Sequence, residues 1–108
     1  MTDADNALSI TLPGAPDLPG EVYAALYRIT GRSTIELRRA VQGGAPVYSA
    51  ALFGNDHLAV VPRLEKTAAY LDGLGLPFVV HEWVDGAPDE ITRETMRNIL
   101  EGTDGQYA

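Results

Sequence analysis

The amino-acid sequence predicts an α+β fold: a small three-stranded sheet covered by helices in the order β-α-α-β-α-β, with one more helix at the C-terminus. Two observations carry this prediction. Strand-like segments lie at 8–12, 46–53 and 77–84, and helical periodicity fills most of the chain between them. Because the chain has 108 residues, of which 45% are hydrophobic, we expect a single domain, 1–108, with a modest core.

The first strand is expected at 8–12, LSITL, where apolar residues alternate with small hydroxyl residues, as they do in a strand with one buried face. A helix is expected to follow Gly20. One face of this helix carries apolar residues at the i, i+3, i+4, i+7 spacing, namely Val22, Ala25, Leu26 and Ile29. We expect this stripe to face the core, with Tyr23 and Tyr27 beside it.

A Thr-Gly turn is predicted to separate the first helix from a second one. Gly31 can adopt the left-handed conformation that ends a helix without steric cost. The second helix should begin at once, because Ser33 and Glu36 have the spacing of a capping box. Its apolar side consists of Leu37, Ala40 and Val41, and the pair Gly43-Gly44 should end it.

The second half of the chain is expected to supply two strands and two helices. The segment 46–53 is apolar on both sides, which favours a central strand. Residues 57–61 fit either a hairpin strand or the first turn of a helix capped by Asn55 or Asp56. A helix should then run to Gly73 with one apolar side, formed by Val61, Leu64, Ala68 and Leu71.

The C-terminal part is predicted to hold the third strand, 77–84, and the last helix, 88–102. Pro88 is expected at the first position of that helix, where its missing N–H is not needed. Gly102 should end it. The segment between them, starting at Asp85, is expected to be a turn.

The predicted order of elements and several motifs resemble the C-terminal domain of the bacterial ribosomal stalk protein. Protease-adaptor proteins share the same superfold. In that family a Thr-Gly turn joins two helices and is followed by a Glu, a basic residue and a closing Val. The similar residues here are Thr30, Gly31, Glu36, Arg38 and Val41. The segment 71–80, LDGLGLPFVV, is similar to the end of the family's third helix and its strand. The resemblance gives a stalk-like core at 8–84 and implies that Phe78 and Val80 point inward.

The sequence departs from this family at the residues that dock translational GTPases. The family uses a basic pair on the first of the two helices, and the corresponding positions are Ala24 and Tyr27. Arg32 replaces the usual leucine after the Thr-Gly turn, and Ile35 replaces the first basic residue of the second helix. No N-terminal dimerisation region with a hinge is recognisable. We therefore expect a divergent, non-ribosomal relative that keeps the fold without stimulating a translation factor.

Composition excludes several classes of function. The chain has no cysteine, which excludes disulfides, zinc-thiolate sites and thiol nucleophiles. No apolar run reaches the roughly 20 residues of a membrane helix. The N-terminus, MTDADNA, is unlike a signal peptide. We expect a cytoplasmic protein that has no membrane partner, while its oligomeric state is left open.

Charge is unevenly distributed along the chain. The formal net charge is −7, which disfavours nonspecific attraction to nucleic acid or anionic lipid. Half of the eight positive residues are Arg28, Arg32, Arg38 and Arg39. The C-terminal part is acidic, with Glu82, Asp85, Asp89, Glu90, Glu94, Glu101 and Asp104. The simplest interpretation is two solvated faces of opposite sign.

The two histidines do not form a recognisable catalytic or metal site. His57 and His81 have carboxylates nearby in sequence, but neither has a partner four residues away on a clear helix. His81 and Glu82 point to opposite faces of a strand. No serine stands in a nucleophile motif, and no glycine run has phosphate-loop spacing. We expect a non-enzymatic protein with no metal and no cofactor; the alternative is a small hydrolase that uses His57 or His81.

A DNA-binding helix-turn-helix at 22–41 is a second alternative, because its length and central Gly31 suit that motif and its arginines could contact phosphates. Two features argue against it. The residue four positions before the glycine, where the helices would pack closely, is the bulky Tyr27. The chain is also strongly acidic. Nucleic acid is therefore not the expected partner.

The remaining candidate is a protein-binding surface on the helix pair. Tyrosine and arginine are favoured in interaction hot spots because they bury a large area and keep polar reach. The candidate residues are Tyr23, Tyr27, Arg28, Arg32, Arg38 and Arg39. The alternative is that both tyrosines cover the edge of the sheet or pack on the C-terminal helix, because aromatic residues of small domains often extend the core. We predict a protein-interaction module with an unidentified protein partner.

Overall fold

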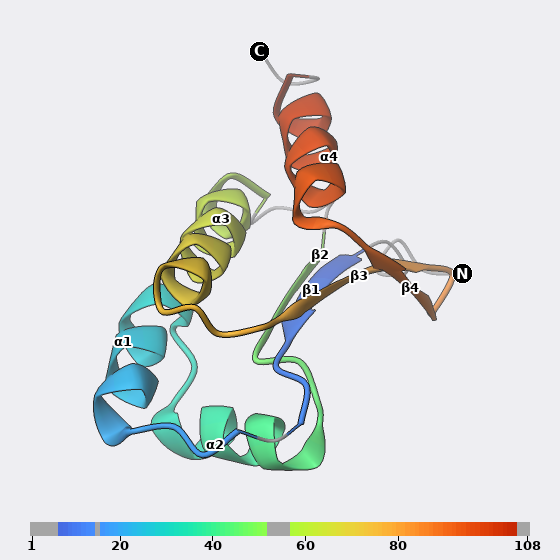
Figure 1. Cartoon of the computed structure of the whole chain (residues 1–108). Coiled ribbons are helices and arrows are strands. Elements are labelled where there is room, and N and C mark those ends of the chain that lie inside the picture. The colour runs from blue at the N-terminus through green and yellow to red at the C-terminus, as the bar shows by residue number, and fades with distance from the viewer. Residues whose placement is uncertain (1–6, 15, 52–56, 106–108) are drawn as a thin grey trace.

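The computed structural model describes residues 7–14, 16–51 and 57–105, which form four helices and one antiparallel sheet of four strands (Figure 1). Their order is β1 (Ala7–Thr11), α1 (Gly20–Thr30), α2 (Thr34–Gly43), β2 (Tyr48–Ala51), α3 (His57–Gly73), β3 (Val79–Val84), β4 (Ala87–Ile91) and α4 (Arg93–Gly105). The predicted α+β class and the predicted order of elements through the third strand are confirmed.

The four strands lie in the order β2-β1-β3-β4, and each neighbouring pair is antiparallel. Ile10 of β1 lies opposite Tyr48 of β2 and Val80 of β3. Because successive side chains point to opposite faces, this register collects the buried apolar residues of the strands on one face. They are Leu8, Ile10, Tyr48, Ala50 and Val80.

The helices cover this apolar face. α3 contacts β1 and β2, α4 contacts β3, and α1 packs against both α2 and α3. In Figure 1, α1, α3 and α4 stand on one side of the sheet, and α2 lies across one end. The helices add fully buried leucines to the core, namely Leu26, Leu37, Leu64 and Leu71. Predicted core residues Val22, Ala40, Val41 and Ala68 are buried as well, and Phe78 packs partly buried against this core.

The second strand differs from its prediction in position and length. It covers Tyr48–Ala51 rather than 46–53, and it forms an edge of the sheet instead of its centre. Tyr48 and Ala50 face the helices, but Ser49 between them is exposed, so only one face of this strand is apolar. Residues 52–56, which include the candidate caps Asn55 and Asp56, lie outside the described residues.

The segment 57–61 belongs to a helix, since α3 begins at His57 and continues through Pro62 to Gly73. The hairpin alternative for this segment is therefore wrong. The side chain of Pro62 is exposed. Pro62 is the sixth residue of α3, so its ring nitrogen cannot make the i→i−4 hydrogen bond that another residue would make at this position.

The region after Val84 is the main correction to the predicted architecture. The predicted helix 88–102 is wrong at its start, because 87–91 form a fourth strand, β4, and α4 starts at Arg93. Asp85 and Gly86 have φ values of 54° and 79°, as the two central residues of a tight hairpin turn require. Pro88 is tolerated because β4 is an edge strand, where one row of backbone groups has no partner. Thr92 then caps α4, since its Oγ1 accepts a hydrogen bond from the amide of Thr95.

Within the described part of the chain, none of the helices combines the length and the apolar character that crossing a bilayer demands.

Candidate protein-binding surface

The Thr-Gly turn fixes the angle between α1 and α2. Gly31 has a φ of 80°, and its amide donates to the carbonyl of Tyr27 at 2.8 Å, which closes α1. The hydroxyl of Thr30 donates to the Leu26 carbonyl at 2.8 Å and accepts from the amide of Arg32 at 3.1 Å. The turn therefore has the helix-ending conformation that its sequence predicts, and both of its residues are hydrogen-bonded.

Arg32 connects this turn to the sheet. Its guanidinium donates from Nη1 to the carbonyls of Pro46 at 2.9 Å and Val47 at 3.0 Å, just before β2 begins. These two carbonyls lie outside any helix or strand ladder, so the arginine supplies the donors they lack. Arg32 was predicted as a protein-binding residue, but the structure gives it a role in holding the fold together.

Arg63 of α3 reaches the same junction from the other side. Its Nη1 donates to the carbonyl of Thr30 at 3.4 Å, and a Cβ placed on Gly31 would lie 3.3 Å from that nitrogen. A cation at this position also suits the negative end of the α1 dipole. Burial raises the pKa of the nearby Tyr48 hydroxyl, and the positive charge of Arg63 acts in the opposite direction.

Tyr23 lies in the core rather than beside it. Its side chain is only 3% exposed, and the other buried residues of α1 are Val22, Leu26 and Thr30. Ala25 and Ile29, which belong to the predicted stripe, are only half-buried. The cause is tertiary: α2 packs against α1 on this side, and the guanidinium carbon of Arg38 lies 4.4 Å from the centre of the Tyr23 ring. This cation–π contact holds Arg38 across the two helices.

Tyr27 and Ile35 are large apolar residues that remain on the surface. Their exposed fractions are 52% and 63%. On α1, Tyr27 lies one helical turn after Tyr23, and on α2, Ile35 lies one turn before Arg38 and Arg39. Because Tyr23 and Arg38 are in contact, the turns that carry Tyr27 and Ile35 lie on neighbouring parts of the two helices. Arg28 and Arg39 are exposed. We call this set the α1–α2 surface: Tyr27, Arg28, Ile35, Arg38 and Arg39.

Of the six predicted binding residues, Tyr27, Arg28, Arg38 and Arg39 are exposed, whereas Tyr23 is buried and Arg32 is half-buried. Tyr23 is buried under Arg38, and Arg32 is bound to backbone carbonyls. The same contacts reduce the number of arginines that a helix-turn-helix could offer to phosphates. Ile35 was not predicted as a binding residue. Its signal in the sequence is an isoleucine on the polar side of an amphipathic helix, opposite Leu37 and Val41.

The start of α2 carries the predicted capping box. The Ser33 hydroxyl accepts from the Glu36 amide at 3.1 Å, and the Glu36 carboxylate accepts from the Ser33 amide at 3.1 Å. The backbone hydrogen bond from Ser33 is the main cause that lowers the pKa of Glu36; the Ser33 side chain and the charge of Arg32 act in the same direction. The box fixes the first turn of α2, from which Ile35 projects.

The two histidines belong to different elements: His57 begins α3, and His81 lies in β3. His81 is half-buried on β3, where the register sets it opposite Ser9 of β1 and Glu90 of β4. Ser9 is fully buried, and its Oγ accepts a hydrogen bond from Nε1 of Trp83 at 2.8 Å, so this hydroxyl is not presented to a substrate. The side chain of His57 lies outside the described part. In the part that is described, no cluster of three or more His, Cys, Asp or Glu side chains could hold a metal ion.

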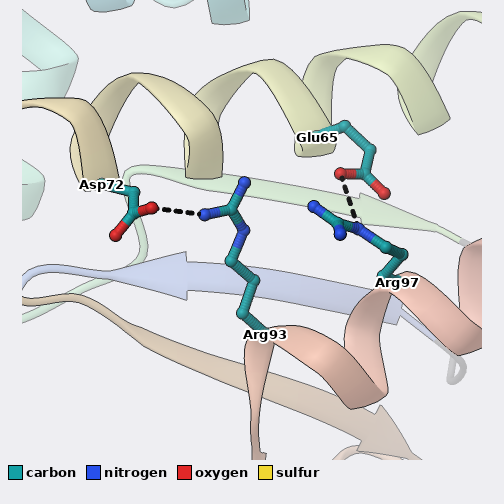
Figure 2. A network of polar contacts seen from close by, with 4 residues as sticks. All are labelled: Glu65, Asp72, Arg93 and Arg97. Atoms are coloured by element: carbon teal, nitrogen blue, oxygen red, sulfur yellow. Dashed lines mark hydrogen bonds and ion pairs between the residues drawn. The ribbon is translucent and has the colours of Figure 1, made fainter.

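A second group of charged residues joins α4 to α3 (Figure 2). Arg93 and Arg97 point from α4 towards the carboxylates of Asp72 and Glu65 on α3, at 2.8 Å and 3.9 Å. A cleft of about 330 Å³ is lined by Arg93, Glu94 and Arg97. Nε of Arg93 is buried without a hydrogen-bond partner. Because both guanidinium groups already face carboxylates, this cleft has little net positive charge for an anion.

Comparisons with protein-family models, with curated proteins and with solved structures found no match for the chain.

Proposed function

We propose that this chain is a non-enzymatic protein-interaction module that binds a protein partner through the α1–α2 surface. One observation carries the proposal: within the described residues, four large hydrophobic side chains are exposed, and two of them, Tyr27 and Ile35, lie on this surface beside arginines. The other two are Leu74 and Val84. Tyrosine and arginine are both enriched in interface hot spots.

The surface is also prepared for binding. Arg38 already rests on the Tyr23 ring, and the capping box fixes the turn that carries Ile35. A side chain that is ordered before association loses less conformational entropy when a partner binds. The net charge of −7 belongs to the whole chain, whereas the described charged residues of this surface are all arginines. We therefore expect the partner to present acidic groups around an apolar anchor.

The proposal extends to ancestry. The resemblance of 8–84 to the ribosomal stalk C-terminal domain would make the chain a divergent, non-ribosomal relative. The order of the first six elements and the hydrogen-bonded Thr30-Gly31 turn support this. Ala24 and exposed Tyr27 occupy the family's factor-docking positions. An aromatic anchor in place of a basic pair would select a different partner from a translational GTPase.

The test is a comparative affinity capture from the native host, read by mass spectrometry. The bait carries Tyr27→Ala together with Arg39→Glu, which removes the anchor and reverses one charge. A matched control carries Leu74→Ala with Lys66→Glu, which likewise removes one exposed hydrophobic side chain and reverses one positive charge, within α3 and just after it. We expect partners that the unmodified chain and the control retain and that the surface variant loses. If all three baits recover the same partners at equal yield, the α1–α2 surface is not the binding site.

A further inference from the structure

The sheet has a second face that the described helices leave uncovered. Its residues alternate with the core-facing ones in the register of the strands. We call them the open sheet face: Ala7, Ser9, Thr11, Ser49, Val79, His81, Trp83, Pro88 and Glu90. Apart from Ser9, which is fully buried, each of these residues is half-buried or exposed.

Trp83 is the only tryptophan of the chain, and it dominates this face. The register sets Trp83 opposite Ala7, whereas its Nε1 donates to Oγ of Ser9, two residues further along β1. The indole therefore leans across β1 over two small side chains, and the hydrogen bond fixes it there. The ring is half-buried, so part of it remains accessible to solvent.

The described charge of this face is negative. Its charged residue is Glu90, which is exposed and lies on the strand next to Trp83, opposite His81. No lysine or arginine is among the described residues of the open sheet face. An aromatic ring attracts a cation through its electron-rich face, and a carboxylate nearby adds a direct ionic partner.

We infer that the open sheet face binds an arginine or lysine side chain of a peptide partner. The accessible part of the Trp83 ring receives the cation. Glu90 reaches the same cation from β4 across His81, because the ring leans towards β1 and β4 lies on the other side of β3. Charge complementarity selects this occupant: no lysine or arginine is among the described residues of the face, and Asp85 lies in the turn of the hairpin beside it. Asp89 lies opposite Glu82, so its side chain belongs to the other face of the sheet. The negative charge of the open sheet face repels phosphate groups, which disfavours a nucleic acid stacking on the indole.

This site is independent of the α1–α2 surface. The two surfaces belong to different elements, and their charges are opposite, so each attracts a different chemical class of partner. A Tyr27→Ala variant is therefore expected to bind a cationic peptide as well as the unmodified chain does. Failure of one proposal leaves the other standing.

The experiment follows the fluorescence of Trp83 in the full chain, since no other tryptophan contributes to the signal. The probe is a short capped peptide of alternating glycine and arginine. The control peptide replaces each arginine by citrulline, which keeps the shape and removes the charge. We expect a saturable change in fluorescence with the arginine peptide and none with the citrulline peptide.

Two variants separate a local site from general attraction to an acidic protein. Glu90→Gln is expected to weaken binding of the arginine peptide by about threefold or more, the scale of an exposed cation–π or ionic contact. Asp17→Asn removes the same charge from the loop before α1 and is expected to leave the affinity unchanged. Both variants keep Trp83, and both change exposed side chains, so neither is expected to unfold the chain.

A third variant tests the ring itself. Trp83→Leu removes the π system, and its binding is measured by calorimetry, with circular dichroism to confirm that the sheet remains folded. Loss of binding in a folded Trp83→Leu chain supports the site. Equal binding of the arginine and citrulline peptides would overturn it, and so would equal effects of Glu90→Gln and Asp17→Asn.

Discussion

The two ends of the molecule are held together by different kinds of contact. At the α1–α2 end, the side chains of Arg32 and Arg63 hydrogen-bond to backbone carbonyls of other segments, and Thr30 bonds to the Leu26 carbonyl within α1. At the α4 end, among the described residues, Arg93 and Arg97 form ion pairs with α3. Buried Met96 and partly buried Ile99 pack in the same core cluster as Leu26 and Leu37. Backbone-directed bonds fix an angle between elements, whereas exposed ion pairs contribute at most about 1 kcal/mol each.

This difference predicts how stability is distributed. The α1–α2 end shares the central core, since Leu26 and Leu37 are buried among residues of β1 and α3. By contrast, four of the five residues of β4 are exposed. We therefore expect α4 and β4 to open locally more often than the helix pair does.

The largest expected effect comes from truncating one buried side chain in each region. Leu26→Ala should lower the free energy of unfolding of the whole domain by about 2–5 kcal/mol, because it leaves a cavity in the central core. Met96→Ala removes a side chain of equal burial, but its loss should mainly release α4. Urea denaturation measures the first effect, and amide hydrogen exchange resolved by peptide measures the second.

The exchange pattern decides whether the two regions are separate. Faster exchange confined to α4 and β4 in Met96→Ala supports the distinction. If exchange rises equally in α1 and β1, α4 belongs to the same cooperative unit as the core, and the contrast between the two ends does not hold.

A smaller effect tests the Thr-Gly turn. Gly31 and Gly44 both end helices with positive φ, 80° and 72°. Alanine at either position should cost roughly 1–2 kcal/mol, because the left-handed conformation crowds its Cβ. At Gly31 the new Cβ would also press on Arg63, whereas nothing lies within 4 Å at Gly44.

Gly31→Ala is therefore expected to be less stable than Gly44→Ala, by up to about 1 kcal/mol, the scale of one hydrogen bond. Thermal and urea denaturation of the two variants measure the difference directly. Equal stabilities would show that Arg63 moves aside without loss, and that its contact with Thr30 does little to join α1 to α3.

Features encoded by neighbouring residues could be predicted from the sequence. The capping box of Ser33 and Glu36 needs only a spacing of three residues, and the end of α1 needs only a glycine at 31. β4 was hard to predict because its neighbouring residues fit two different structures. Asp85-Gly86 fits a turn before a helix as well as a hairpin turn, and Pro88 suits the first turn of a helix as well as an edge strand.

Features that depend on register or helix packing could not be predicted in this way. Tyr23 is buried because α2 brings Arg38 over its ring, which no periodicity within α1 indicates. The relation of Trp83 to Ser9 joins residues 74 positions apart. Of the predicted binding set, Tyr27, Arg28, Arg38 and Arg39 lie on the surface, Tyr23 is buried, and Arg32 hydrogen-bonds to backbone carbonyls; binding by any of them stays a prediction.

The smallest expected effect separates the charge of the Glu36 carboxylate from the neutral hydrogen bond of the Ser33 hydroxyl in the capping box. The Ser33 amide lowers the folded-state pKa of Glu36 below its ordinary value of 4.5. The carboxylate therefore stabilises the fold above that value, and this contribution is lost as pH falls through the lower, folded pKa. Urea denaturation from about pH 7 down to about pH 3 measures it as the stability difference between the unmodified chain and Glu36→Gln. That difference should shrink on acidification, because glutamine still accepts from the Ser33 amide but has no charge to lose. Ser33→Ala should stay destabilising at acidic pH, since its hydroxyl accepts from the Glu36 amide whatever the charge of the carboxyl. A pH-independent Glu36→Gln difference would mean that the α1–α2 end owes nothing to this charge, and that its rigidity comes from the neutral hydrogen bonds of the turn alone.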